Sequence, residues 1–458
     1  MKHYILFLFT ALTLVSCTEF LDIKPYGKEI PEDVEDFSAL IHHICNDLDY
    51  GNLACEAVFG SYGSAGNLYE AASDNMEVNL TEFPQGALLS HYIGARASST
   101  SYTFLYSTIR TCNIVIGEME EGRDTRAGMD LLGTSYAIRG VCYYQLLRHY
   151  CAPPLADDGQ LGLPLVTEFD MEAKPIRSTM QETIAQIEKD FQTALDYNIQ
   201  EPMYRFNDVI LHGFLARLYH WCGRWKEARQ EALAVLAKAP LISGADYVKM
   251  LNQQFGISGN KLIGQRYGST LGINEFYNTL KARPLSTRFI SLFPEGDADI
   301  RHTFFFNAKR QNTKICYAGM RSAEMALIAM ESAYHLGDLP TALQELNDFR
   351  RLRITPYTDL TMATLPAIRS DEYIKEDCYG DPLTPLLYAI LAERRKELYM
   401  ENGDRFFELK RNGRPEWWVM YKGLKYWNRK YMYTWPLPVE DIELQPKLIQ
   451  NPGYNETI

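Results

Sequence analysis

The sequence predicts a mostly α-helical protein in which antiparallel helical hairpins form a scaffold and loop-rich segments are inserted between them. Apolar residues recur at spacings of three and four along most of the chain, whereas few stretches show the alternation typical of strands. The same helix–turn–helix pattern occurs in two separate segments. The 30 glycines and 21 prolines are close to ordinary usage, which favours a folded chain over a low-complexity one.

The N-terminal segment combines a basic tip with a short apolar run from Tyr4 to Val15. At about 1.5 Å per residue such a run spans roughly 18 Å, well short of the ~30 Å hydrocarbon core of a bilayer. The pattern predicts a signal peptide over residues 1–16 rather than a membrane-spanning helix. Cys17 stands at the expected cut, which resembles the bacterial lipoprotein signal, in which the cysteine is lipidated. The alternative is an ordinary signal peptide with an incidental cysteine.

The remaining chain, residues 17–458, is predicted to form a single domain. Its acidic character, a net charge of −12 for the full sequence, gives no counterion-release gain on a phosphate backbone, which argues against nucleic acid as a partner. It argues equally against attachment to a membrane through a basic patch, which leaves the lipid as the expected anchor.

The cysteines after Cys17 are predicted to be mostly buried thiols, although an exported protein can also pair them. Their spacing is irregular and contains no CxxC, and Cys142 and Cys222 lie inside helical apolar patterns. The eight residues concerned are Cys45, Cys55, Cys112, Cys142, Cys151, Cys222, Cys316 and Cys378. Metal binding has little support, and no cofactor is predicted.

Helices are expected first at Ser98–Met119, Ala127–Tyr150 and Met180–Tyr197. The first hairpin follows. Its small and aromatic residues Ala216 and Tyr219 precede Gly223, which ends one helix, and the next helix begins its apolar face five residues later.

The second hairpin repeats this spacing 114 residues downstream. A stripe of small residues lets a neighbouring helix approach closely, and it consists of Ala326, Ala329, Ala333 and Gly337. Gly337 ends the helix, Asp338 caps the next one, and Pro340 is tolerated in its first turn. This is tetratricopeptide spacing, but uninterrupted arrays repeat every 34 residues or so, which indicates a broken repeat with a long insertion.

The segments near 50–95 and 240–320 fit helices poorly, and long irregular segments on a rigid scaffold commonly carry binding residues. A sugar ring packs its C–H face on an aromatic ring and offers hydroxyls to amide and charged groups. Two groups meet this need: Tyr62, Tyr69, Asp74, Asn75, Phe83 and Tyr92 in the first segment, and Arg266, Tyr267, Asn274, Phe276 and Tyr277 in the second. The alternative for each is a packed core side chain.

No catalytic residue is predicted. Glu393 and Glu397 resemble an acidic pair, but they share a helical pattern with Leu391 and Leu398, and Glu393 stands three residues before Lys396, so a structural ion network is favoured. No nucleophile elbow, phosphate loop, zinc motif or dinucleotide fingerprint appears.

Two further groups receive structural interpretations. The run Asn402-Gly403-Asp404 is interpreted as a helix C-cap followed by an N-cap. Trp417 and Trp418 are adjacent and cannot face the same side of a helix or strand, so they and Trp427 are interpreted as packing or partner contacts.

Five segments in order along the chain resemble those of one protein family. They are Cys17–Asp22 with Pro25, Tyr136–Tyr150 with Pro153–Leu155, Glu324–Asp338, Glu393–Leu398 with Gly403–Arg411, and Trp435–Pro438 with Gln450–Tyr454. Together they resemble the SusD/RagB family of outer-membrane nutrient-binding lipoproteins of Bacteroidetes. The Ser73-Asp74 stretch resembles a family segment near the ligand face, and Asp297, Asp299 and Arg301 resemble a structural turn.

The resemblance implies a SusD-like α-α superhelix that is lipid-anchored to the outer membrane, faces the cell surface and captures nutrient oligomers. The ligand implied first is an oligosaccharide or polysaccharide, delivered to a SusC-type TonB-dependent transporter. Residues 60–95 contain no tryptophan, which weakens a starch ligand in particular. The alternatives are a peptide-binding lipoprotein of the same family and, further away, a surface enzyme that degrades glycans.

Overall fold

The computed structural model describes residues 31–50, 69–70, 73–77, 90–156, 160–252, 261–264, 284–315, 317–421 and 424–454. The helices are α2 (Val34–Tyr50), α5 (Ser90–Glu118), α6 (Arg126–Tyr150), α7 (Met180–Tyr197), α8 (Asp208–Trp221), α9 (Trp225–Lys238), α10 (Gly244–Asn252), α12 (Thr287–Ile290), α13 (Ile300–Phe305), α14 (Ser322–His335), α15 (Leu339–Arg351), α16 (Pro385–Glu397), α17 (Asp404–Arg411) and α18 (Val439–Leu444), with short 3-10 turns η2 (Pro202–Tyr204), η3 (Gly296–Ala298) and η4 (Lys430–Tyr433).

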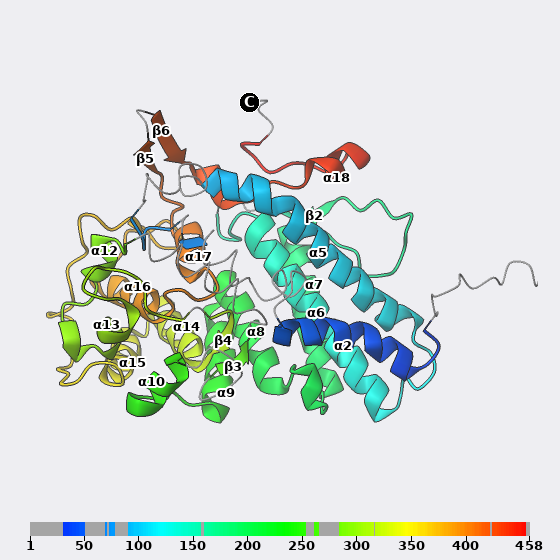
Figure 1. Ribbon diagram of the computed structural model, residues 1–458, viewed down its shortest axis with the longest axis horizontal. Coiled ribbons are helices and arrows are strands. Elements are labelled where there is room, and N and C mark those ends of the chain that lie inside the picture. Colours follow the sequence, from blue (N-terminus) through cyan, green and yellow to red (C-terminus); the bar gives the residue numbers. More distant parts are fainter. Residues whose placement is uncertain are drawn as a thin grey trace, which may run out of the picture.

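Strands contribute little to the described part of the chain, which confirms the predicted mostly α-helical fold. They form three separate antiparallel pairs: β1 (Leu161–Pro164) with β2 (Arg177–Thr179), β3 (Lys261–Gly264) with β4 (Gly319–Arg321), and β5 (Trp417–Tyr421) with β6 (Leu424–Asn428). Figure 1 shows β5 and β6 projecting at the top of a body made of helices, whereas β3 and β4 lie among the helices near α8 and α9.

The predicted helices before the first hairpin are confirmed, with differences at their ends. The helix α7 has the predicted bounds, whereas α5 begins eight residues earlier than expected, at Ser90. The residues before Ser98 are mostly small or polar and lack a clear apolar stripe, so periodicity did not reveal this first part of the helix.

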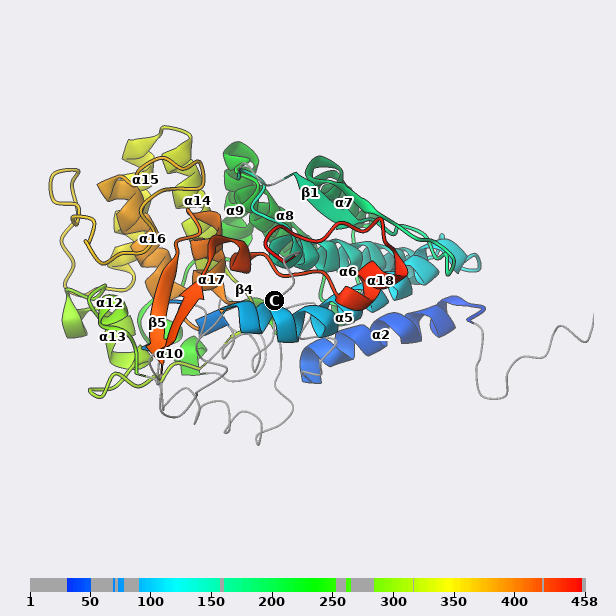
Figure 2. The ribbon, with the colours of Figure 1, turned by 90° about the horizontal axis from the view of Figure 1, so that it is seen from above.

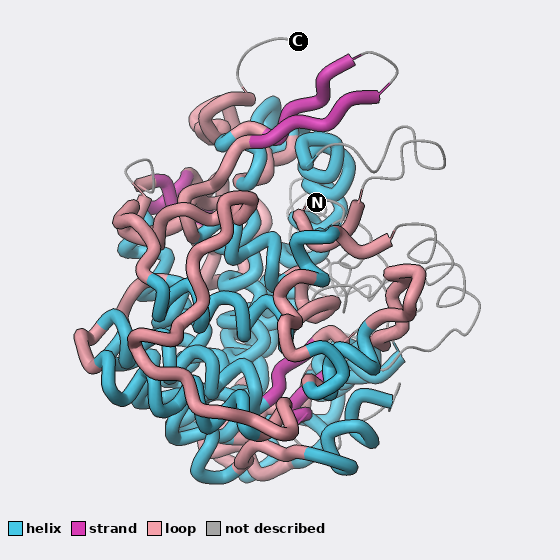
Figure 3. Tube along the Cα trace, turned by 90° about the vertical axis from the view of Figure 1, so that its left-hand side faces the viewer, coloured by secondary structure: helices cyan, strands magenta, loops and turns pink. Residues whose placement is uncertain are grey.

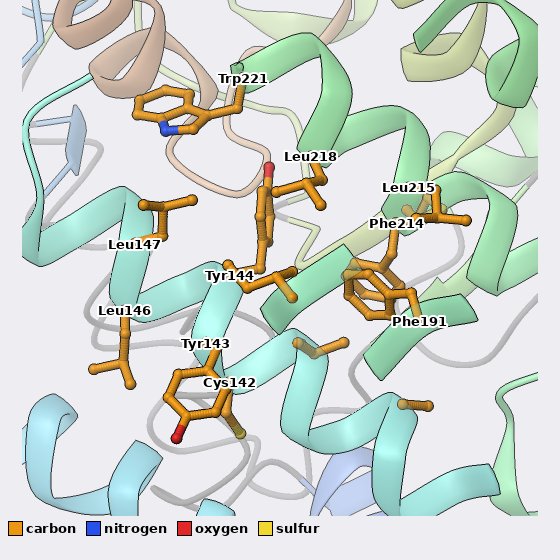
Figure 4. Packing of buried hydrophobic residues seen from close by; sticks show 14 of the residues in the cluster. Cys142, Tyr143, Tyr144, Leu146, Leu147, Phe191, Phe214, Leu215, Leu218 and Trp221 are labelled. Atoms are coloured by element: carbon orange, nitrogen blue, oxygen red, sulfur yellow. The ribbon is translucent and has the colours of Figure 1, made fainter. Parts of the chain in front are cut away.

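The helix α6 lies at the centre of the largest apolar core and is buried on nearly every side. Its buried residues include polar ones, and two of these have partners outside the helix: Asp130 accepts from the Gln200 amide, and Arg139 binds Asp190 of α7. Its Gly133 and Gly140 lie against α7 and the residues after it, where an added Cβ atom would come within 2.8 Å of Tyr197 and 2.9 Å of Phe191. Figure 4 shows Phe191 of α7 beside Phe214 of α8. The centroids of the two rings are 5.6 Å apart.

The two predicted hairpins pack against each other. α14 lies against both α9 and α15, and Arg229 of α9 donates to the Ala329 carbonyl (2.6 Å) and pairs with Glu345 of α15 (2.6 Å). Gly337 has a φ of 82° between α14 and α15, and the Asp338 side chain accepts from the Thr341 amide, as predicted. The predicted broken tetratricopeptide-like scaffold is therefore confirmed.

The segment 240–320 contains more helix than predicted. It contributes α10, α12 and α13, which are only four to nine residues long and so were too short for periodicity to reveal. Ser286 and Asp299 cap two of them through their side chains. These helices pack around Phe289 and Tyr399 as a second core.

The predicted buried thiols are confirmed for the cysteines that the structure describes. Cys112, Cys142, Cys151, Cys222 and Cys378 are free and buried, and Cys45 is buried as well. Cys17, Cys55 and Cys316 lie outside the described residues.

Candidate ligand-binding site

A cavity of about 640 Å³ lies between α5, the loop from Pro164 to Pro175, and α18 with the residues after it. Its volume falls within the range of roughly 300–1,000 Å³ that is typical of small-molecule sites. Figure 2 shows α18 lying close to α5 when the molecule is viewed from above.

The floor of the cavity is one face of α5. Tyr102, Tyr106 and Arg110 are spaced by four residues, so their side chains lie above one another on the same face. The rings of the two tyrosines are 4.6 Å apart between centroids. Burial raises the pKa of both phenols, so both stay protonated at neutral pH and can donate a hydrogen bond.

The loop wall is held in place by hydrogen bonds to its backbone. Tyr106 donates through its hydroxyl to the Pro164 carbonyl (2.8 Å), and Tyr143 donates to the Val166 carbonyl (2.8 Å) and accepts from the Val166 amide (2.7 Å). Asn113 donates to the same Val166 carbonyl (2.9 Å). A loop fixed at so many backbone atoms presents its side chains in a defined arrangement.

Farther along this loop, a buried pair supplies another support. Arg139 of α6 donates to the Thr167 carbonyl (3.1 Å) while its other nitrogens bind Asp190 of α7 (2.6 and 2.9 Å). The guanidinium group therefore joins the scaffold directly to the wall of the cavity.

The opposite wall is joined to the same loop. Gln445, just after α18, donates through its side-chain amide to the Lys174 carbonyl (2.7 Å). At the end of the loop, Arg177 donates to Asn451 (2.6 Å) and to the Gly162 carbonyl (2.7 Å). The C-terminal segment and the loop thus form one connected frame.

Charged groups surround this aromatic floor and keep free hydrogen-bonding capacity. Within the described part of the chain, the Arg110 side chain donates one hydrogen bond, to the Ser107 hydroxyl (3.5 Å), and neither Arg110 nor Lys174 has an ion-pair partner there. Glu168, Asp170 and Asp441 line the same cavity. Partial burial, and then the neighbouring Glu440, raise the pKa of the Asp441 carboxyl.

This arrangement suits a ligand with an apolar face and a fringe of hydroxyls. Tyr106 and Phe169, whose side chain is 40% exposed, offer ring surface for C–H groups. Carboxylates accept from hydroxyls, and the Arg110 guanidinium donates to them. None of these residues was singled out from the sequence, although the four-residue spacing of Tyr102, Tyr106 and Arg110 was a usable signal.

The predicted site residue Tyr69 is buried. Its ring packs against Phe406, Phe407 and Trp435, and its hydroxyl forms a short hydrogen bond with Nε2 of His149. Burial lowers the pKa of His149 well below its usual value, so the ring is neutral and Nε2 accepts. The structure gives Tyr69 a packing role, which was the alternative left open by the sequence.

Asp74 and Asn75 are buried beside two arginines of the C-terminal half. Arg405 donates to both Asp74 carboxylate oxygens (2.7 and 3.0 Å), and Arg395 donates to Asn75 Oδ1 (2.8 Å). Burial favours the neutral carboxyl, but Arg395 and Arg405 outweigh it and lower the pKa of Asp74. The polar atoms of Asp74 and Asn75 join the N-terminal part of the chain to its C-terminal part. A ligand contact of these two residues stays a prediction.

The other predicted binding residues are not tested. Tyr62, Phe83, Arg266, Tyr267, Asn274, Phe276 and Tyr277 lie outside the described residues. Tyr92 lies in α5, of which only the backbone is described at that position.

The acidic pair on α16 belongs to a buried ion network, as predicted. Glu393 pairs with Lys396 (2.6 Å) and Arg301 (2.8 Å), and Glu397 pairs with Arg353 (3.0 Å). Burial raises a carboxyl pKa, but the surrounding cations outweigh it and lower the pKa of both glutamates. Carboxylates held charged by cations on several sides lack the free proton that a general acid needs.

The structural roles predicted for two turns have different outcomes. Asp299 binds Arg301 (2.7 Å) in the buried interior, which confirms a structural role. The predicted N-cap role of Asp404 is wrong, because Gly403 precedes the helix with a φ of 68° and Asp404 is its first residue. The Asp404 carboxylate instead forms an ion pair with Arg394 (2.5 Å).

Two family models match the sequence. Residues 19–220 match SusD-like_3, described as starch-binding and associating with the outer membrane, and residues 305–454 match SusD_RagB, the SusD family. The two matches include the second hairpin, α14 and α15, and the C-terminal segments that resemble the family. The chain belongs to the SusD/RagB family. No curated protein sequence matches it.

Solved structures with the same fold extend over nearly the whole chain. A SusD superfamily protein from Bacteroides thetaiotaomicron has a TM-score of 0.69 at 20% identity, covering 92% of this chain and 100% of the other. A putative sugar binding protein from Bacteroides vulgatus has a TM-score of 0.67 at 21% identity, covering 93% and 100%. A laminarin binding SusD-like protein has a TM-score of 0.60 at 14% identity, also covering 93% and 100%.

Neither a membrane span nor a metal site is found in the described ranges. None of the helices there has the length and apolar character needed to cross a membrane. No group of three or more His, Cys, Asp or Glu side chains there is arranged to hold a metal ion.

Proposed function

We propose that this SusD/RagB protein captures a glycan in the cavity between α5, the Pro164–Pro175 loop and α18, and holds it without chemical change. The observation that carries the proposal is the combination of a ring-lined floor with charged groups that have no ion-pair partner there. The sugar-binding and laminarin-binding descriptions of two proteins with this fold support a glycan as the ligand class.

Direct binding measurements with variants of the cavity test this proposal. Calorimetry against laminarihexaose, maltohexaose and other neutral oligosaccharides should reveal saturable binding of at least one of them. Phe169→Ala removes ring surface and Arg110→Gln removes a charged donor, and each should weaken binding about tenfold. Met171→Ala is the matched control, because Met171 is exposed in the same loop but does not line the cavity.

Three outcomes would contradict parts of the proposal. Equal affinity of Phe169→Ala and the unchanged protein would exclude this cavity as the site. Binding of peptides but of no glycan would favour the peptide-binding alternative. Release of shorter sugars, abolished by Glu168→Gln, would show that the protein is an enzyme.

The cellular setting is part of the same proposal. The chain is exported, lipidated at Cys17, held on the outer face of the outer membrane and paired with a SusC-type TonB-dependent transporter that takes up the ligand. The outer-membrane association in the description of the matching family supports this setting.

Replacement of the lipidated residue tests the anchor. Cys17→Ser removes the thiol that receives the lipid, so the protein should move from the membrane fraction to the soluble periplasmic or secreted fraction. A Cys55→Ser variant controls for the loss of a thiol elsewhere. Unchanged membrane attachment of Cys17→Ser would contradict lipidation at this residue.

A further inference from the structure

The β5–β6 hairpin extends away from the helical body (Figure 3). Its register gives it two faces with different side chains. The register places Trp418 opposite Trp427. Lys425 stands two residues before Trp427 in the chain, and Arg429 stands two residues after it. Because side chains alternate between the two faces of a strand, these four residues share one side of the hairpin.

The inner face accounts for the packing of the hairpin. Trp417 stacks on Tyr373 with ring centroids 5.0 Å apart and contacts Tyr433 at 6.2 Å, and Asn428 beside it is buried. Trp417 therefore attaches the hairpin to the body of the protein. Trp418, on the other face, is 44% exposed.

On the outer face, cations lie over the aromatic rings. The Lys425 ammonium is 4.5 Å from the centroid of Trp418, and the Arg429 guanidinium is 4.2 Å from that of Trp427. The two indole rings are 6.5 Å apart and inclined by 55°. Such contacts orient the rings and leave positive charge beside them. Arg429 also has a longer contact with Glu416 (3.7 Å).

The charge of this segment is opposite to that of the whole chain. Residues 414–430 contain five basic residues and one acidic residue, whereas the full sequence has a net charge of −12. A local positive region attracts anionic ligands even on a protein that is acidic as a whole. Aromatic rings and cations together match a sugar that carries a carboxylate or sulfate group.

We propose that the outer face of the β5–β6 hairpin, formed by Trp418, Lys425, Trp427 and Arg429, is a second binding site, specific for acidic sugar residues. The sugar ring stacks on the exposed indole of Trp418 while its anionic group pairs with Lys425 or Arg429. This site is separate from the cavity beside α5, so a polysaccharide with charged units is held at more than one point.

Binding of hexagalacturonate, compared with neutral maltohexaose, tests the hairpin site by calorimetry at low and high salt. The unchanged protein should bind hexagalacturonate, and binding should weaken as salt is raised. Trp418→Ala and Lys425→Gln should each weaken it about tenfold. Lys226→Gln on α9 is the matched control, because it removes the same charge from an exposed residue outside the hairpin and should change affinity less than twofold.

The cavity variant Phe169→Ala separates the two sites, because it should leave hexagalacturonate binding at the hairpin unchanged even if the cavity binds no glycan at all. Three results would overturn the hairpin site: no binding of hexagalacturonate, equal binding by Trp418→Ala, or equal losses in Lys425→Gln and Lys226→Gln. Binding to anionic phosphatidylglycerol vesicles that needs Trp418, without binding of hexagalacturonate, would instead show that the face contacts lipid headgroups.

Discussion

At the scale of single residues, polar side chains of this protein divide into those matched by buried partners and those left available to a ligand. Asp74 and Glu397 are enclosed by arginines, whereas Arg110 and Lys174 at the cavity have no ion-pair partner in the described ranges. Residue type alone does not separate the two classes, because Asp, Glu, Arg and Lys occur in both.

Asp74→Asn should therefore destabilise the fold strongly. The substitution keeps the shape of the side chain but leaves Arg395 and Arg405 buried with one carboxylate fewer, at a cost of about 3–5 kcal/mol. Urea unfolding followed by circular dichroism measures this loss. The control is Asp348→Asn, which breaks an exposed pair with Arg351 and should have little effect.

The same variant tests the ligand role predicted for Asp74. If Asp74→Asn had the stability of the unchanged protein but bound glycan more weakly, direct ligand contact would be supported and the structural role described here would be contradicted.

At the scale of elements, short signals at helix ends define the hairpins. Gly337 has a φ of 82°, a backbone conformation that a residue with a Cβ atom adopts at a cost, and open space surrounds the position where that atom would stand. The turn between α14 and α15 thus depends on the backbone freedom of glycine and not on a lack of room.

Gly337→Ala should lower the free energy of unfolding by roughly 1–2 kcal/mol, because alanine is strained in the left-handed region. The matched variant is Gly117→Ala near the end of α5, where there is also open space but the backbone is helical. That change should stabilise by roughly 0.5 kcal/mol. Equal effects of the two substitutions in thermal or urea unfolding would contradict this explanation of the turn.

At the scale of the whole molecule, buried ion networks join segments that are far apart in the sequence. Arg395 bonds to Asn75 across 320 residues, and Arg405 bonds to Asp74 across 331 residues. These contacts hold the N-terminal and C-terminal halves of the protein together, so its stability depends on the charge of the carboxylates.

Stability should decrease in acid, most steeply below about pH 4. The pKa of Asp74, Glu393 and Glu397 is lowered in the folded protein, so their contribution is present above the unfolded values near pH 4 and is lost as the pH falls through the folded values. His149, whose folded pKa is also lowered, adds a loss that begins near the unfolded value of about 6.5.

Urea unfolding at a series of pH values from 8 to 3 measures this dependence. The free energy of unfolding should begin to fall below about pH 6.5 and fall more steeply below about pH 4, by about 1.4 kcal/mol for each unit of pKa shift that is titrated. A free energy that stayed constant down to pH 3 would contradict the ion networks described above.

Prediction from the sequence was most successful where the signal is local. The bounds of α7, the turn at Gly337 and the cap at Asp338 depend on residues within a few positions of one another, and the structure confirms them. The short helices α12 and α13 were missed because four to six residues are too few to establish a period.

The candidate site was much less predictable. Its lining comes from α5, a loop more than 50 residues later and α18 near the C-terminus, so no single segment shows it. Aromatic residues in irregular segments were a reasonable signal, but Tyr69 is a core residue, while the tyrosines of the cavity lie on a helix that was interpreted as scaffold.

The sequence by itself determined the helical hairpins, the capped turns, the buried thiols and the ordered segments that indicate the family, because each depends on neighbouring residues or on their order along the chain. The tertiary structure alone decided which charges are paired, where a cavity opens, and that Trp418 is exposed while Trp417 is packed. Those properties depend on contacts between residues separated by up to several hundred positions, and such contacts leave no periodic or local pattern in the sequence.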